Sequence, residues 1–538
     1  MEDQTPLHMQ TTEYMGLQTE ESADQTDRMS MDHTGPMEEA MGGISNPMPT
    51  SDPDNPQNWP LHRKVYVSFV AFSFAFAVAF GLTSYTIGIG DVVAEFNISM
   101  TLAIAPFSLY LVGIAFAPVY TPHVTERFGR APVYFVSLPI CALFLLGSSR
   151  AQSIGALAVL RFFAGLGGGP CLVLIEGTFA DVWPARTTVT YYSGLTLASY
   201  LGAAFGPIIL GSIVPSTSWR WTAYVSLMVC LAAYLIGIGA PETYAREIVR
   251  TRARRVGRPH DLPPAQSGTT LRRMAQLTVV DPLIMIFTEP IVIMTTLYVS
   301  FVFGTTFQWF IAVPAALNLT YGFGIRSSGL AFISAVVGAL LAAGTATVIE
   351  QFLILLKMRQ CKDQEMVQME IEYRLVPAMV GGVLMTGAFF WVGYTTVPSI
   401  NHFLPIVGTG IYVWGSMMIL ISYISYLFDA YPATGTLSAL TVAASLRLLV
   451  AAVIPLAIIQ MITNLGGDWA YGTFGVISAA LYPISIVVFK FGARLRMRSR
   501  YGGSGSGSDG RDGHGLVMVT LRTHQRVKST PANGMDSS

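Results

Sequence analysis

Apolar residues in this chain form long blocks that short polar segments separate. A helix of about 20 apolar residues is long enough to cross the roughly 30 Å hydrocarbon core of a bilayer. Gly, Pro and charged residues interrupt the blocks and therefore mark the ends of the expected helices. The pattern predicts twelve membrane-spanning helices, near residues 65–90, 101–120, 132–149, 153–178, 188–213, 221–239, 283–306, 326–349, 376–394, 403–427, 432–460 and 469–490.

The twelve expected helices fall into two sets of six, which predict a six-helix bundle over residues 59–240 and another over 282–498. Between them lies the polar stretch 241–281, which we expect to be a basic loop. Its arginines are Arg246, Arg250, Arg252, Arg254, Arg255, Arg258, Arg272 and Arg273. Residues 1–58 are rich in Met, Thr, Glu and Asp, and residues 499–538 include a Gly/Ser run, so both are predicted to be disordered tails.

Basic residues are concentrated in alternate segments between the expected helices. Such segments face the cytosol in membrane proteins, so the pattern predicts that both termini are cytosolic. The basic residues in these segments, besides those of the central stretch, are Arg127, Arg130, Arg186, Lys357, Arg359, Lys362, Arg374, Lys490, Arg494, Arg496, Arg498 and Arg500. The segment around Asp429 has no cation and is the one exception. The sequons at Asn97 and Asn318 fall in segments assigned to the outside, where N-glycosylation occurs.

The composition agrees with a membrane protein. Charged residues make up 12% of the chain, against about 25% in a soluble globular domain. The formal net charge is zero, so no basic field favours a nucleic acid partner. Cys141, Cys171 and Cys230 lie in apolar blocks and Cys361 in a polar loop, without the spacing of a zinc site or a disulfide framework.

Other classes of function have no support in the sequence. We find no cluster of His or Cys, no nucleophile elbow and no phosphate-binding loop, and therefore expect no enzyme activity, metal or cofactor. No basic stretch with an apolar run and a cleavage site begins the sequence, so we expect no removable signal peptide.

Ionisable residues inside the expected helices are Arg161, Glu176, Glu289 and Arg447. Each costs a few kcal/mol to place in a bilayer and normally faces a cavity or a partner. Residues 161 and 176 are close to four helical turns apart, about 22 Å along the axis, so we expect both to project from one face that lines a cavity. Glu176 and Glu289 are candidate proton carriers, because burial favours a neutral carboxyl group and a nearby cation favours a charged one. Alternatively, each acid fixes helix packing through hydrogen bonds.

The two arginines also leave two interpretations open. Arg161 and Arg447 are candidates to hold a substrate anion or to tune a carboxyl group, and arginines also satisfy carbonyl groups at unwound turns. Asp91 and Glu95 follow the first helix and predict a solvated outer rim or a site that attracts cations.

Small residues and prolines form two further patterns. Gly202, Gly206, Pro207 and Gly211 predict a rigid, close-packed kink in the fifth helix. The fourth helix carries the run 165–170, rich in glycine and ending in proline, which fits either a hinge or close packing.

Several motifs resemble the major facilitator superfamily. The loop Glu126-Arg127-Phe128-Gly129-Arg130 is similar to its signature loop, Arg161 to Gly165 resembles its fourth-helix motif, and Gly202 to Gly211 resembles its antiporter motif. Finer features resemble the fungal drug:proton antiporter branch with twelve spans, which exports secondary metabolites and toxins. These are Asn55-Pro56-Gln57-Asn58-Trp59, Trp219-Arg220-Trp221, Pro241-Glu242-Thr243-Tyr244 and Asp429-Ala430-Tyr431-Pro432, and the similarity covers about residues 52–498.

The resemblance implies an all-α fold of two six-helix bundles around a central cavity that opens to one side at a time. It implies that Glu126, Arg127, Gly129 and Arg130 form a cytosolic gating loop, and that Arg161 belongs to a proton relay. Two positions depart from the family pattern. Pro122 lies where the loop motif usually begins with glycine, and Glu176 lies where many relatives carry a small residue, which indicates a coupling or substrate-specific role.

The expected function is therefore proton-coupled efflux of a small organic molecule, such as a secondary metabolite, toxin or drug, as in multidrug resistance. We expect a monomer in the plasma membrane whose partners are its substrate, protons and lipid. The alternatives are a nutrient transporter or a polyamine transporter, the latter expected to need several carboxylates in the cavity; a membrane sensor or membrane enzyme has less support. The aromatic residues Tyr298, Trp309, Phe389 and Trp391 fit a bulky or aromatic cargo, and equally fit packing or the membrane interface.

Overall fold

The computed structural model describes residue 48 and residues 52–183, 188–256, 280–360, 366–431, 433–497 and 516–520. Most of the two predicted tails lies outside these ranges. So do Arg186, Arg258, Arg272, Arg273, Cys361, Lys362, Arg498 and Arg500.

Helices account for most of the described chain. Those of the first half are η1 (Pro56–Asn58), α3 (Leu61–Thr83), η2 (Ser84–Gly88), α4 (Ile89–Phe96), α5 (Met100–Ala115), α6 (Ala117–Phe128), α7 (Arg130–Ser149), α8 (Ile154–Val182), α9 (Thr188–Ile213), η4 (Val214–Ser216), α10 (Trp221–Gly237) and α11 (Ala245–Val256). Those of the second half are α13 (Asp281–Thr288), α14 (Pro290–Tyr321), α15 (Ile325–Leu330), α16 (Ile333–Gln360), η7 (Ile371–Leu375), α17 (Val376–Thr395), α18 (Phe403–Ala430), α19 (Ala433–Leu465), α20 (Gly467–Leu481) and α21 (Pro483–Met497).

The helix count agrees with the predicted twelve spans. Within the described residues, 10 helical segments are long and apolar enough to cross a membrane, and the pair α5 and α6, bent by 42°, makes 11. The shorter apolar helix α10 completes six segments in the first half. Helices suit this environment because they satisfy every backbone polar group within the segment, where no water can do so. The all-α membrane fold is confirmed.

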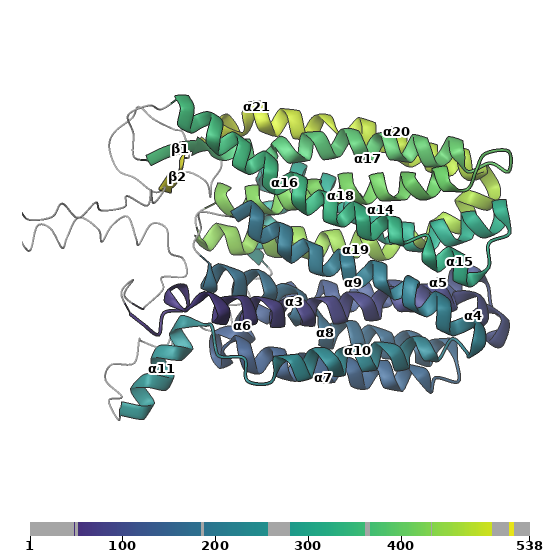
Figure 1. Cartoon of the computed structure of the whole chain (residues 1–538), viewed down its shortest axis with the longest axis horizontal. Coiled ribbons are helices and arrows are strands. Elements are labelled where there is room, and N and C mark those ends of the chain that lie inside the picture. Colours follow the sequence, from purple (N-terminus) through teal and green to yellow (C-terminus); the bar gives the residue numbers. More distant parts are fainter. Residues whose placement is uncertain are drawn as a thin grey trace, which may run out of the picture.

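The two sets of six helices lie side by side as two bundles (Figure 1). Two seams join them: α5 and α6 pack against α19, and α9 packs against α15, α16 and α18. Because each half crosses an even number of times, α3 begins and α21 ends at the same end of the molecule. We call it the terminal end, and the opposite one the far end.

Breaks in the long helices occur next to prolines. Proline removes a backbone donor and crowds the preceding turn, and Pro118, Pro290 and Pro483 follow the breaks between α5 and α6, α13 and α14, and α20 and α21. Each span therefore changes direction without losing its place in the bundle.

One helix and one pair of strands at the terminal end were not predicted. The central stretch 241–281 contains the basic helix α11, and strands β1 (Met366–Glu370) and β2 (Leu516–Thr520) pair antiparallel, with Met366 opposite Thr520. The strand β2 falls in the segment expected to be disordered. The predicted all-α fold class therefore holds for the two bundles, and the strand pair lies beside them (Figure 1).

Candidate functional site

One carboxylate and one guanidinium from different halves approach each other inside the molecule. Glu176 lies on α8 and Arg447 on α19, and their charges act on each other without a direct ion pair. Both lie deep in the molecule, yet both keep partial exposure. Both residues are therefore partly accessible to water. The Arg447 guanidinium lies 5.2 Å from the ring centre of Phe303 on α14, a distance at which a cation and a ring attract.

Two tyrosines of α9 lie near Glu176 and Arg447. Tyr192 lies within electrostatic range of Glu176, and Tyr200 within that of Arg447. The hydroxyl groups of Tyr200 and Ser416 on α18 are 3.4 Å apart, and Tyr200 also bonds to Thr306 on α14. A polar layer thus runs between the halves at this level. We call Glu176, Tyr192, Tyr200, Phe303 and Arg447 the central site.

Several buried hydroxyl groups around the central site have no hydrogen-bond partner among the described residues. They are those of Thr196 on α9 and of Thr296 and Ser300 on α14, and the Arg447 Nε also has none. Residues 296, 300 and 303 follow helical spacing and share one face of α14 with Phe303, just as residues 192, 196 and 200 share one face of α9. Buried polar groups normally have partners, so this pattern indicates a space that water or a ligand fills.

Arg161 does not join the central site. Its guanidinium donates to the carbonyl groups of Gly81 at 3.3 Å and Leu82 at 3.4 Å, and it lies 4.4 Å from the ring centre of Tyr85. It is 1% exposed and fills the interior of the first half. The expectation that it shares a cavity face with Glu176 is not met. Fifteen steps of about 100° leave a residual rotation of about 60°, and Pro170 lies between the two positions.

Glu289 also lies elsewhere. It precedes α14 at the terminal end, is 1% exposed and bonds to Tyr431, the residue that follows α18. This contact fits the packing role that the sequence left open for it.

The predicted gating loop gives one buried ion pair. Arg130 donates to Asp181 at 3.0 Å, and the carboxylate of Glu242 accepts from the backbone N–H of Arg130 at 2.9 Å. The side chains of the other charged loop residues, Glu126 and Arg127, are not part of this ion pair. Arg127 is exposed, and the Glu126 carbonyl accepts from Arg250 at 3.3 Å. Gly129 has a φ of 85° and packs against Glu242, so a side chain there would be strained and crowded.

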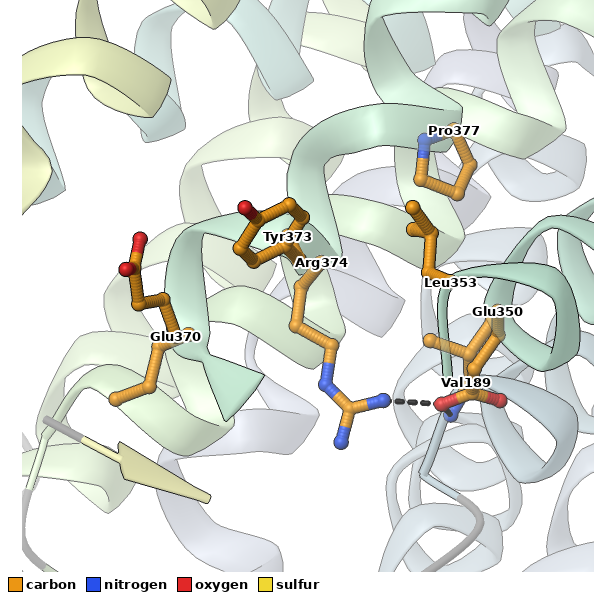
Figure 2. A pocket seen from close by; sticks show the side chains of 8 residues that line it. Val189, Glu350, Leu353, Glu370, Tyr373, Arg374 and Pro377 are labelled. Atoms are coloured by element: carbon orange, nitrogen blue, oxygen red, sulfur yellow. Dashed lines mark hydrogen bonds and ion pairs between the residues drawn. The ribbon is translucent and has the colours of Figure 1, made fainter. Parts of the chain in front are cut away.

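A related cluster at the terminal end of the second half reaches across to the first. Arg374 pairs with Asp429 at 2.9 Å and with Glu350. Figure 2 shows Arg374 directed at Glu350, with Val189 of the first half beside the carboxylate. Glu350 accepts from the Val189 N–H at 3.4 Å and from the Thr190 hydroxyl at 3.5 Å, at the first turn of α9. A negative charge is favourable at a helix N-terminus, so Glu350 joins the two halves at this end.

Close packing joins the halves at the far end. A Cβ on Gly329 of α15 would lie 2.5 Å from the Pro207 carbonyl of α9, and one on Gly206 would lie 2.5 Å from the Thr83 hydroxyl of α3. Gly211 also packs on Gly329, and Gly202 on the backbone of α3. The predicted fifth-helix motif is therefore the surface through which α9 meets both halves. The glycines of the run 165–170 in α8 also pack closely, against α3, α5, α6 and α7, which favours close packing over a hinge there.

Several polar residues that the sequence assigned to the outside lie together at the far end. Glu95 pairs with Arg220 at 2.6 Å and accepts from the Trp219 indole at 2.7 Å, and Asp91 lies in the first turn of α4. The sequon residues Asn97 and Asn318 are both exposed at this end.

The aromatic residues considered as cavity candidates lie either in the interior of the second bundle or on its outer surface. Trp309 stacks on Tyr412 at 4.0 Å and meets Phe389 edge-on at 5.4 Å, among α14, α17 and α18. Tyr298 is fully buried, and Trp391 is 43% exposed on the outer face of α17. They pack the second bundle and its surface.

Sequence reasoning missed several residues of these sites. The central site includes Tyr192, Tyr200 and Phe303, and no spacing in the sequence distinguishes them from packing aromatics. The partners Asp181 and Glu350 were also missed. One signal was present: Asp181-Val182-Trp183-Pro184-Ala185 repeats as Asp429-Ala430-Tyr431-Pro432-Ala433. Both aspartates of this repeat pair with an arginine that precedes them in the same half, Arg130 and Arg374.

Comparisons with known proteins agree on one family. The family model described as Major Facilitator Superfamily matches residues 69–455. The chain is 30% identical over 495 residues to "MFS-type transporter traF" of Penicillium crustosum, covering 91% of this chain and 98% of that protein. It is 29% identical over 461 residues to "Efflux pump FUBT" of Fusarium oxysporum, covering 84% and 76%. It is 28% identical over 478 residues to "Polyamine transporter 4" of Saccharomyces cerevisiae, covering 84% and 72%.

A solved structure supports the same fold. The proton:xylose symporter XylE matches with a TM-score of 0.57 at 14% identity, covering 80% of this chain and 96% of that one. At this identity the likeness concerns the fold alone.

Proposed function

Because the chain belongs to the Major Facilitator Superfamily, a family of membrane transporters and not of enzymes, we propose that it exports a small organic molecule in exchange for protons. Relatives named as an efflux pump and as a transporter of a citrinin biosynthesis cluster support export. The observation that carries proton coupling is Glu176, a carboxylate deep in the molecule that keeps partial exposure and lies within electrostatic range of Arg447. Few groups other than a carboxyl group can exchange a proton in such a place.

The proposed cycle alternates between the two sets of contacts that join the halves. Release of Glu350 from the first turn of α9 opens the terminal end and admits the cargo. Separation of Gly329 from Pro207 opens the far end and releases it. The central site lies between these contacts and meets one side at a time. Arg130 and Asp181 hold the end of α8 rigid within the first half.

We propose that the terminal end faces the cytosol and the far end the outside of the plasma membrane, with the chain acting as a monomer. The basic helix α11 lies at the terminal end, as cytosolic segments do. Asn97 and Asn318 would then be open to N-glycosylation. If Asn97 and Asn318 carry glycans, a glycosidase should shift the electrophoretic mobility of the protein, and the double variant Asn97→Gln/Asn318→Gln should show no such shift. If the arginine-rich stretch were accessible from outside the cell, the orientation would be the reverse.

The experiment that tests coupling compares two acids inside the molecule. Glu176→Gln in proteoliposomes should abolish substrate-driven proton movement and leave substrate exchange intact, because the amide binds without titrating. Glu289→Gln is the matched control, since that acid is also buried but bonds to Tyr431 away from the central site. Unchanged coupling in Glu176→Gln would remove Glu176 from the proton path.

A further inference from the structure

The charges of the central site limit the charge of its cargo. Among the described residues, the titratable groups that face Glu176 are Arg447 on α19 and Tyr192 on α9, and those that face Arg447 are Glu176 and Tyr200. Asp429 and Arg374 act on Tyr192 but not on Glu176 or Arg447. The site therefore holds one negative and one positive charge, which compensate each other, besides neutral hydroxyl groups.

A charged cargo would disturb this balance. A carboxylate would pair with Arg447 and leave Glu176 without its counter-ion, whereas an ammonium group would pair with Glu176 and leave Arg447 unpaired. An uncompensated charge is costly inside a protein within a membrane. A polyamine adds several positive charges to a site with one carboxylate, so its cost is greater still. A neutral cargo leaves the compensation intact.

Exchange for protons adds a second condition, because cargo and proton must compete for one group. A hydroxyl group on the cargo can donate to the charged carboxylate of Glu176, and protonation weakens that hydrogen bond because a neutral carboxyl group is a poorer acceptor. An anionic cargo would do the opposite. By occupying Arg447 it would favour protonation of Glu176, so that proton and cargo would move in the same direction.

The walls of the site define the rest of the cargo. The rings of Phe303 and Phe307 on α14 are 4.9 Å apart, and Phe307 lies 6.3 Å from Phe107 of the first half. These rings form an apolar surface that crosses the seam beside Arg447. The guanidinium offers donors to a carbonyl oxygen, and the unpartnered hydroxyl groups of Thr296 and Ser300 lie on the same face of α14.

We propose that the cargo is a neutral, planar aromatic molecule that donates a hydroxyl group to Glu176, accepts from Arg447 through a carbonyl oxygen, and stacks on the partly exposed ring of Phe303, which Phe307 meets edge-on. This assignment rests on the proposed function of proton-coupled export. It separates the chain from the relative named as a polyamine transporter.

Three probes with one ring system test the assignment. They are 2-(hydroxymethyl)anthraquinone, which is neutral, 2-(aminomethyl)anthraquinone, a cation, and anthraquinone-2-carboxylate, an anion. Calorimetric titration of the purified full-length chain in detergent gives their affinities at several pH values. We expect the neutral probe to bind at least about tenfold more tightly than either ion, and more tightly as the pH rises and Glu176 loses its proton.

Two variants assign the contacts. Glu176→Gln should bind the neutral probe at every pH about as weakly as the protonated acid does, without pH dependence. Arg447→Met should weaken binding of that probe. Trp391→Phe is the control, because it alters an aromatic residue on the outer surface and should change neither the affinity nor its pH dependence. Tightest binding of the cation or the anion, unchanged pH dependence in Glu176→Gln, or binding of none of the three probes would overturn the assignment.

The same probes in proteoliposomes distinguish this assignment from the proposed function. If the neutral probe binds as expected but moves no protons, proton-coupled export is wrong and the neutral cargo class stands. If protons move in exchange for a charged probe that binds most tightly, proton-coupled export stands and the neutral cargo class is wrong.

Discussion

The contact of Glu350 with the first turn of α9 should control opening at the terminal end. Glu350 is 5% exposed, pairs with Arg374 and reaches two donors of the first half, at 3.4 and 3.5 Å. In Glu350→Gln the charge is lost, so the attraction to the helix N-terminus and the charge-assisted bonds both weaken. Arg374 keeps Asp429 as a partner at 2.9 Å, and we therefore expect the bundle to remain folded.

The size of the effect follows from the contacts that cross between the halves. A hydrogen bond to a charged group contributes about 1.5–3 kcal/mol at good geometry, and a charge at a helix N-terminus about 0.3–1 kcal/mol. Both bonds are long, so we expect Glu350→Gln to cost the closed terminal end about 1–2 kcal/mol. That corresponds to a factor of about 5–30 in the ratio of open to closed molecules.

Distances between spin labels can measure this ratio. His62 and Arg494 are exposed residues at the terminal end of the two halves, and cysteines there carry the labels in a Cys361→Ser background, since Cys141, Cys171 and Cys230 are buried. Double electron–electron resonance should show a larger long-distance population in Glu350→Gln. Asp181→Asn is the control, because it breaks a comparably buried pair that lies within one half. An equal shift in both variants, or none in Glu350→Gln, would refute the reasoning.

Three further outcomes are expected. Gly206→Ala places a Cβ 2.5 Å from a side-chain oxygen of α3 and should destabilise the protein by about 1–3 kcal/mol, seen as a lower Tm, whereas Gly194→Ala enters open space and should not. A tag inserted within residues 245–275 should be protected from external protease in intact cells, and cleavage there would overturn the orientation. The Arg252 guanidinium lowers the pKa of Asp52. Their contact is therefore fully formed above the usual aspartate pKa of about 4 and is lost as the pH falls through the lowered value. Hydrogen-exchange protection factors of residues 52–59 should not change between about pH 5 and 8, because Asp52 stays charged throughout that range.

Apolar length predicted most spanning helices well and one poorly. The expected span 403–427 corresponds to α18 (Phe403–Ala430), but the expected span 283–306 corresponds to α14 (Pro290–Tyr321). The expected span ends at Thr305 and Thr306, near the middle of α14. In the structure, Thr305 and Thr306 donate to carbonyl groups one turn earlier in the same helix, at 2.9 and 2.8 Å. Their hydroxyl groups are satisfied locally, so the helix continues through them.

The sequence predicted the charged residues of the candidate site, but not which residues they contact. An ionisable residue in an apolar block is visible in the sequence, which identified Glu176 and Arg447. Their meeting across the two halves depends on how the bundles pack, and no spacing in the chain encodes it. Helical spacing also led to a wrong grouping. It placed Arg161 on the same face as Glu176, whereas in the structure Arg161 contacts α3 and α5.

Proton movement driven by a neutral cargo tests proton-coupled export most directly. Proteoliposomes that contain the full-length chain and a pH-sensitive dye receive 2-(hydroxymethyl)anthraquinone on one side, with protein-free liposomes as the control. We expect the internal pH to change in the direction of exchange, with protons leaving as the probe enters, and we expect Glu176→Gln to abolish the change. Probe uptake by the unmodified protein without any proton movement would contradict proton-coupled export.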